Sequence, residues 1–337
     1  MTETVVDTRR VPTRPLGVRS WRRDDRERGC RDDRHDRHDR PDRVHAVTGR
    51  LTVIGDLVED VVVWTAGEAR HGTDNPSTIT RSRGGSAANV AACAAALVAT
   101  RFIGRVGDDP TGDRLTAELG ARGVEMLVQR GGRTGTVVVL VDHTAERTMF
   151  NDRAASAELT DVDDGWFAGT AALHVPAYGL ATEPMRSALL AAARAVTTGG
   201  AMVSVDLSAV TVMESIGVPT FAALLDQMSP SVVFANREEA EVLDLLGTPP
   251  VAGRLHVVKD GPRPAVVVRS DGGRAVVPAV PVDPVVDTTG AGDAFAAGYL
   301  AAAIRGAEPT DACAAGHRRA ATVLGMWGAD PGLTPAG

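Results

Sequence analysis

Short apolar runs alternate with longer amphipathic or alanine-rich stretches along most of the 337-residue chain. The runs have the length of strands, and the stretches between them have the apolar spacing of helices. The expected strands are at residues 51–56, 102–103, 173–175, 202–205, 232–234 and 255–259, with a hairpin at 265–269 and 274–277. The expected helices are at residues 84–99, 109–120, 182–195, 219–228, 291–304 and 310–325. Such alternation predicts an α/β fold with a mainly parallel sheet and helices on both faces.

Two segments, within residues 56–83 and 134–151, break this alternation. They carry strand patterns at residues 61–64, 134–141 and 147–150 with no helical stretch among them. We therefore predict a small separate sheet. A sheet of this kind can serve as a lid that covers a site and excludes water.

The first 46 residues differ from the rest in composition. Residues 19–43 alternate Arg, Asp and His, and the whole segment has almost no apolar periodicity. Such a segment cannot bury enough apolar surface to offset the entropy that is lost on ordering. We expect residues 1–46 to be a disordered extension and residues 47–335 to form the folded domain.

Charge and composition disfavour several classes of function. The first 46 residues carry 13 Arg against 10 acidic residues, whereas the remainder carries 23 basic against 33 acidic residues. An acidic body makes nucleic acid an unfavourable partner. The longest apolar run, at residues 87–99, is too short to span a bilayer, and no export signal is visible. Cys30, Cys93 and Cys313 lack metal-ligand spacing, so we expect reduced thiols in a cytoplasmic protein.

The clearest chemical pattern is D-T-T-G-A-G-D-A-F at residues 287–295. Gly290, Ala291 and Gly292 lead into an apolar helix, and the free N–H groups of a helix N-terminus form an anion site without a basic side chain. A carboxylate would repel a phosphate, so Asp293 is better suited to act as a base for a hydroxyl that attacks phosphorus. The simpler alternative is that Asp293 caps the helix.

Two other expected helices also begin with polar groups. Gly84 and Gly85 let a ligand approach the backbone closely, and the amide of Asn89, one turn later, can donate to and accept from a hydroxyl. Asn236 and Glu239 open the second of these helices. Their spacing equally fits a capping box, in which each side chain binds a backbone N–H group of the other residue.

Together these motifs resemble the PfkB, or ribokinase-like, family of sugar and nucleoside kinases over nearly all of residues 47–335. G-G-S-A-A-N at 84–89, G-R-V-G-D-D-P-T-G at 104–112, N-R-E-E at 236–239 and D-T-T-G-A-G-D at 287–293 occur in the family's order. The resemblance implies a doubly wound α/β core with a small β lid. It also implies an ATP-dependent kinase.

The resemblance assigns roles to particular residues. Asp293 corresponds to the catalytic base, and the anion hole comprises the backbone of Gly290, Ala291 and Gly292. The residues implied to bind substrate are Asp60, Gly84, Gly85, Asn89 and Arg153. The residues implied to lie on the nucleotide and magnesium-phosphate side are Asn236, Glu239, Lys259 and Gly261. Arg153 is similar to an arginine that binds a carboxylate in family members acting on keto-sugar acids, although a surface arginine would give the same pattern.

ATP and Mg²⁺ are the cofactors that the resemblance implies, with Mg²⁺ held near Glu239 through water. Asp287 and Thr289 are candidate ligands of a monovalent cation such as K⁺. A homodimer formed through the lid is also implied.

The function expected from these observations is phosphorylation of a primary hydroxyl of a small sugar or sugar derivative. A nucleoside kinase with the same chemistry is the first alternative, and Trp64 is the only aromatic residue near the lid that could stack on a base. A sugar-binding regulator without catalysis is the second, but such a protein would not need an intact G-A-G-D motif.

Overall fold

The computed structural model describes residues 49–65, 67–142 and 146–325. The extension predicted at residues 1–46 lies outside the described residues, and its disorder stays a prediction. Within the described ranges, no helix is both long enough and apolar enough to cross a membrane.

Nine of the described strands form one mostly parallel sheet, as predicted. Across the sheet they are β13 (Arg274–Val277), β12 (Arg263–Val268), β11 (Leu255–Asp260), β10 (Val232–Ala235), β9 (Met202–Asp206), β8 (Thr170–Pro176), β1 (Arg50–Ile54), β4 (Thr100–Val106) and β5 (Val124–Arg130). Only β12 runs antiparallel to its neighbours among these strands. The chain winds outward from β1 in both directions, so the carboxyl ends of β1 and β8 flank the switch point where such sheets bind ligands.

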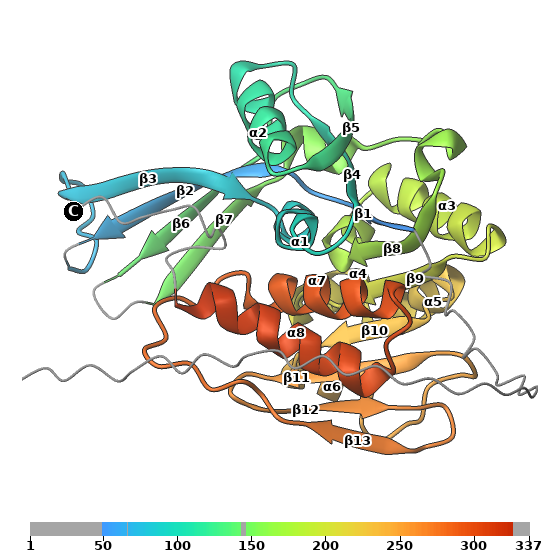
Figure 1. The fold of residues 1–337 in the computed structure, drawn as a ribbon. Coiled ribbons are helices and arrows are strands. Elements are labelled where there is room, and N and C mark those ends of the chain that lie inside the picture. The colour runs from blue at the N-terminus through green and yellow to red at the C-terminus, as the bar shows by residue number, and fades with distance from the viewer. Residues whose placement is uncertain (1–48, 66, 143–145, 326–337) are drawn as a thin grey trace, which may run out of the picture. The chain divides into compact units, whose positions relative to one another are not determined.

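Helices cover both faces of this sheet (Figure 1). The helices that contribute to the core on one face are α1 (Ser86–Ala95), α2 (Pro110–Ala121), α7 (Ala291–Ile304) and α8 (Pro309–Leu324). Those that contribute to the core on the other face are α3 (Met185–Thr198), α4 (Val210–Ile216), α5 (Val218–Met228) and α6 (Arg237–Val242). Short 3₁₀ helices occur at η1 (Ala154–Glu158), η2 (Asp164–Phe167) and η3 (Ala177–Ala181). Successive strand residues alternate between the two cores, as the pleat requires.

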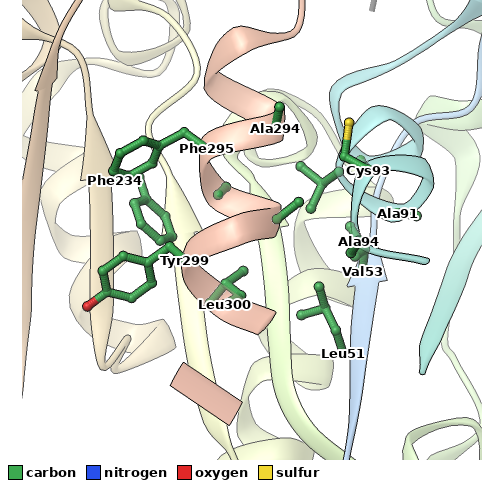
Figure 2. Packing of buried hydrophobic residues seen from close by; sticks show 14 of the residues in the cluster. Leu51, Val53, Ala91, Cys93, Ala94, Phe234, Ala294, Phe295, Tyr299 and Leu300 are labelled. Atoms are coloured by element: carbon green, nitrogen blue, oxygen red, sulfur yellow. The ribbon is translucent and has the colours of Figure 1, made fainter. Parts of the chain in front are cut away.

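Helix α7 lies at the centre of the first core (Figure 2). On one side its Phe295 and Tyr299 pack against Phe234 of β10, with the Phe234 and Tyr299 ring centroids 5.1 Å apart and nearly perpendicular. Its small residues let α8 approach closely, because a Cβ on Gly298 would lie 2.7 Å from the backbone oxygen of Ala315. Apolar residues surround the helix, which fixes the position of its N-terminus relative to the sheet.

A second sheet of four strands forms the predicted lid. Its order is β3 (Ser77–Gly84), β2 (Val58–Thr65), β6 (Thr136–Val141) and β7 (Arg147–Asp152). In Figure 1 these strands form a group separate from the main sheet. The strand expected from residue 134 begins at Thr136, because the backbone N–H and hydroxyl groups of Thr134 donate to the carboxylate of Asp109 instead.

Several elements differ from the sequence prediction for reasons visible in their side chains. Strand β4 extends well beyond the expected residues 102–103 because the buried Arg101 finds polar partners, including Glu125 on β5 at 3.0 Å. Strands β3 and β5 were not predicted, because both are edge strands with many polar residues. Helix α1 ends at Ala95, earlier than the expected residue 99.

Candidate active site

The carboxylate of Asp293 lies in the first turn of α7 and binds side chains of α1. Ser86 Oγ donates to Asp293 Oδ1 at 2.6 Å, and Asn89 Nδ2 donates to Oδ2 at 3.0 Å. Gly290, the residue before the helix, has a φ of 74°, a left-handed conformation that favours glycine. The N-cap residue is Gly290, which has no side chain, and the described hydrogen bonds of Asp293 are those from Ser86 and Asn89.

Burial raises the pKa of Asp293 to about 6. The hydrogen bonds from Ser86 and Asn89 act in the opposite direction, whereas the charge of Asp206 adds to the rise and that of Lys259 opposes it. A carboxylate with this pKa is still mostly ionised at neutral pH. It is also a stronger base than an ordinary aspartate, which suits proton abstraction.

Asp60 on β2 lies close to Asp293 and against the paired glycines. A Cβ on Gly84 would lie 2.0 Å from Asp60 Oδ1, so only glycine leaves room for this carboxylate. Gly85 has a φ of 97°, and a Cβ there would lie 2.4 Å from the backbone oxygen of Asp56. Burial is the main cause that raises the pKa of Asp60 to about 6; the charge of Arg83 opposes this rise, and the charge of Asp293 adds to it.

Arg83 connects the lid to the residues around Asp293. Its side chain is buried at the end of β3, and its Nη1 donates to Asn89 Oδ1 at 2.8 Å. This bond turns the amide of Asn89 so that its nitrogen faces Asp293. Arg83 was not identified from the sequence, where it lies in a polar strand without any motif.

Lys259 and Glu239, which the sequence assigns to the nucleotide side, both lie within electrostatic range of Asp206. Lys259 Nζ donates to Asp206 Oδ2 at 2.7 Å, and both side chains are largely buried. Burial acts to lower the pKa of Lys259, but the paired Asp206 outweighs it and raises the pKa. A Cβ on Gly292 would lie 3.3 Å from Lys259 Nζ, so the glycine keeps the ammonium close to the start of α7.

Asn236 and Glu239 form the capping box at the start of α6. Asn236 Oδ1 accepts from the backbone N–H of Glu239 at 2.8 Å, and Glu239 Oε2 accepts from that of Asn236 at 2.8 Å. Glu239 is buried, and burial, followed by the charge of Asp206, raises its pKa. Gly261 lies in the exposed turn between β11 and β12 with a φ of 56°.

Comparisons with known proteins identify the family of the chain. The family described as pfkB family carbohydrate kinase matches residues 49–335. The chain belongs to this family. It is 32% identical over 273 residues to the fructokinase of Klebsiella pneumoniae, covering 76% of this chain and 84% of that protein. A 75-residue stretch is 45% identical to 2-dehydro-3-deoxygluconokinase of Escherichia coli K12, covering 22% of this chain and 24% of that protein.

The fold comparison leads to the same family. The crystal structure of adenosine kinase from Sinorhizobium meliloti has a TM-score of 0.74 and 25% identity to the chain, and the match covers 85% of this chain and 97% of that structure. The protein is therefore an ATP-dependent carbohydrate kinase with a ribokinase-like fold. This agrees with the fold class and the enzyme class predicted from the motifs.

Arg153 of the kinase, predicted to bind substrate, is paired with Asp56. Its Nε and Nη2 atoms donate to Asp56 Oδ2 and Oδ1 at 3.0 and 2.8 Å. Its role toward substrate stays a prediction. Asp56 and Asp206 were not identified from the sequence as site residues, although each follows or ends a predicted strand, where parallel sheets present functional groups.

Asp287 and Thr289, the predicted ligands of a monovalent cation, contact the lid. Arg147 of β7 donates to Asp287 Oδ1 and to the hydroxyl of Thr289. Asp287 Oδ1 also accepts from the backbone N–H and the hydroxyl of Thr289, both at 2.8 Å. These contacts tie the lid to the segment directly before the anion hole predicted at Gly290.

Tyr178, in the 3₁₀ helix after β8, is a further residue that the sequence did not single out. Burial raises the pKa of Tyr178 to about 12, and the charges of Asp293, Asp206, Glu239 and Asp56, in that order of size, also raise it. The phenol therefore lies within electrostatic range of carboxylates from four parts of the chain. Its hydroxyl donates to the backbone oxygen of Ser208 at 3.2 Å.

Proposed function

We propose that the kinase transfers the γ-phosphoryl group of ATP to a primary hydroxyl of a small sugar, with Asp293 as the general base. The observation that carries this proposal is the Asp293 carboxylate, which lies in the first turn of α7 with a raised pKa and is bonded, among the described residues, to a hydroxyl and an amide. A carboxylate so placed can take a proton from a hydroxyl at neutral pH. Asp60, Gly84, Gly85, Asn89 and Arg153 form the sugar side.

The anion hole is the backbone of Gly290, Ala291 and Gly292. N–H groups at the start of α7, together with the helix dipole, stabilise the charge that develops on the transferred phosphoryl group. Lys259 lies 3.3 Å from the Cβ position of Gly292 and supplies a positive charge on the same side. Asn236, Glu239 and Gly261 complete the nucleotide side.

The donor set fits Mg²⁺ bound through water and phosphate rather than in a protein cage. Among the described residues, no group of three or more His, Cys, Asp or Glu side chains could hold a metal ion. Mg²⁺ commonly keeps several waters and binds one or two carboxylates plus substrate phosphates, and both oxygens of Glu239 accept from Asn236. Glu239 would therefore hold Mg²⁺ through a water molecule. When bound, the ion supplies charge neutralisation at the phosphates.

A monovalent cation at Asp287 and Thr289 is a further proposal. Both residues offer oxygen atoms next to the anion hole, but these oxygens also accept from Arg147. A bound K⁺ would share them with the guanidinium. Initial rates measured with KCl against tetramethylammonium chloride at equal ionic strength test for this cation.

A homodimer through the lid is supported by exposed apolar residues on its strands. Ile79 of β3 and Phe150 of β7 are 59% and 56% exposed, and the strand register places both on the same face as Val63 and Val138. Exposed apolar patches of this kind often mark protein contacts. Sedimentation velocity measures the oligomeric state. We also propose a cytoplasmic location, which suits the buried free thiols of Cys93 and Cys313.

A nucleoside kinase is the second candidate function, because the similar structure from Sinorhizobium meliloti is an adenosine kinase. Trp64, on β2, is the aromatic residue expected to stack on a base. An assay of ADP release with a panel of sugars and nucleosides separates the sugar kinase from the nucleoside kinase.

Asp293→Asn tests the proposed mechanism. The substitution keeps the size of the side chain and removes the base, so turnover should fall by about 10²- to 10⁴-fold while ATP affinity and melting temperature change little. Asp311→Asn is the matched control, because Asp311 also lies in the first turn of a helix but is exposed. Near-normal turnover in Asp293→Asn would contradict the assignment of the base.

A further inference from the structure

Asp56 and Arg153 form a two-point ion pair beside the proposed sugar site. Asp56 lies two residues after the end of β1, and Arg153 directly follows β7 of the lid. The two N–H···O distances are 3.0 and 2.8 Å, and the side chains are only 12% and 20% exposed. Two parallel charge-assisted bonds of this kind match the planar fork of a guanidinium. Asp56 therefore binds the edge of Arg153 that would otherwise be suited to a carboxylate ligand.

The remaining nitrogen of the Arg153 guanidinium is also bound. Nη1 donates to the backbone oxygen of Tyr178 at 3.0 Å, and Nη2 makes a second contact with Met185 Sδ at 2.9 Å. A guanidinium has five N–H donors, and these contacts direct most of them at protein atoms. An anionic group on a ligand would have to displace Asp56 in order to pair with Arg153.

The position of the pair makes such displacement unfavourable. A Cβ on Gly85 would lie 2.4 Å from the backbone oxygen of Asp56, and a Cβ on the neighbouring Gly84 would lie 2.0 Å from Asp60 Oδ1. The two carboxyl-bearing residues therefore lie against adjacent glycines. A ligand anion beside Arg153 would meet the Asp56 carboxylate while the charge of Arg153 is already matched. Like charges brought together in this way are strongly disfavoured.

We infer that Asp56 determines substrate class by pairing with Arg153, so that the sugar site accepts neutral sugars and rejects sugars that carry a carboxylate or phosphate. This inference rests on the proposed function of the same site. A neutral hydroxyl can donate to the Asp56 carboxylate, which an anionic group cannot do. The relatives include proteins named for both classes, a fructokinase and a 2-dehydro-3-deoxygluconokinase. The Asp56–Arg153 ion pair favours the class that acts on neutral sugars.

The test compares kcat/KM for D-fructose and for 2-dehydro-3-deoxygluconate at saturating ATP. The wild-type enzyme should prefer the neutral sugar by at least about 30-fold, as expected for a like-charge clash. Asp56→Asn removes one negative charge and leaves Arg153 free to pair with a ligand. This variant should reduce the preference by at least about 10-fold, through increased activity with the acid.

Asp152→Asn is the matched control. Asp152 precedes Arg153 directly and pairs with the exposed Arg133, so its loss should leave the preference unchanged. A wild-type enzyme that uses the acid as well as fructose would overturn the inference, even if the Asp56 variant failed to fold. An unchanged preference in folded Asp56→Asn would also overturn it. If neither the sugars nor the acid were phosphorylated, the proposed function itself would fail, and the inference with it.

Discussion

The hydrogen bond from Ser86 to Asp293 gives a measurable prediction for the pH dependence of the reaction. Ser86→Ala removes a 2.6 Å bond to a carboxylate whose pKa lies at about 6. A hydrogen bond to a charged group is worth about 1.5–3 kcal/mol, which corresponds to about 1–2 pKa units. Since this bond favours the ionised form, its loss should raise the pKa of Asp293 to about 7–8.

Ser86→Ala should therefore lose activity at acidic pH but not at alkaline pH. As the proposed base, Asp293 must be ionised, so the acidic limb of kcat/KM should move from about pH 6 to about pH 7–8. At pH 6 the activity should fall by about 5- to 50-fold relative to wild type, and at pH 9 it should be nearly equal to wild type. The assay is ADP release from pH 5 to 9 with the best sugar substrate.

Ser215→Ala is the control for this experiment. Among the described contacts, the Ser215 hydroxyl donates to the backbone oxygen of Val212 in α4. Its removal should therefore leave the pH of the acidic limb unchanged. An acidic limb in Ser86→Ala that stays at the wild-type pH, or moves downward, would refute the reasoning. A uniform loss at every pH would mean that Ser86 acts on something other than the ionisation of Asp293.

Two other substitutions test neighbouring parts of the site. Gly84→Ala places a Cβ 2.0 Å from Asp60 Oδ1, which forces the Asp60 carboxylate to move. The KM for sugar should therefore rise by about 10-fold or more, while the KM for ATP changes little. Equal changes in both KM values would contradict the assignment of Asp60 to the sugar side. Lys259→Met leaves the buried Asp206 without its cation, and the free energy of unfolding in urea should fall by about 3–5 kcal/mol. A loss below about 1 kcal/mol would show that the pair contributes little to stability.

The fold could be predicted from the sequence because the buried strands are apolar and short. The apolar run before Gly55 and the run before Asp206 both match strands of the main sheet. The strands that were not predicted are stabilised by contacts with residues distant in the sequence. Arg101, for example, is buried in β4 only because Glu125 and the backbone oxygens of Trp166 and Ala168 accept its N–H groups. The sequence around Arg101 does not indicate these partners.

The site could be predicted only where a motif keeps its residues close together in the chain. Asp293 and its adjacent glycines are one such group, and the structure adds that Asn89, 204 positions away, donates to the same carboxylate. Arg83 carries no motif, so only tertiary packing identifies it. Asp56 stands at the end of a predicted strand, but only the structure shows that it pairs with Arg153. Asp206 could have been identified from the sequence, because it is the polar residue at the carboxyl end of an apolar strand.

The way charges are matched at the site separates structural carboxylates from reactive ones. Asp206 is bonded to Lys259 and Asp56 to Arg153, so each of these acids is paired with a cation. The described contacts of Asp293 are instead neutral, a hydroxyl and an amide, and burial raises its pKa to about 6. A buried acid whose pKa is raised by burial, and only partly lowered by neutral donors, can gain and lose a proton within the working pH range. Among the acids of this site, that arrangement makes Asp293 suited to receive the proton of the sugar hydroxyl.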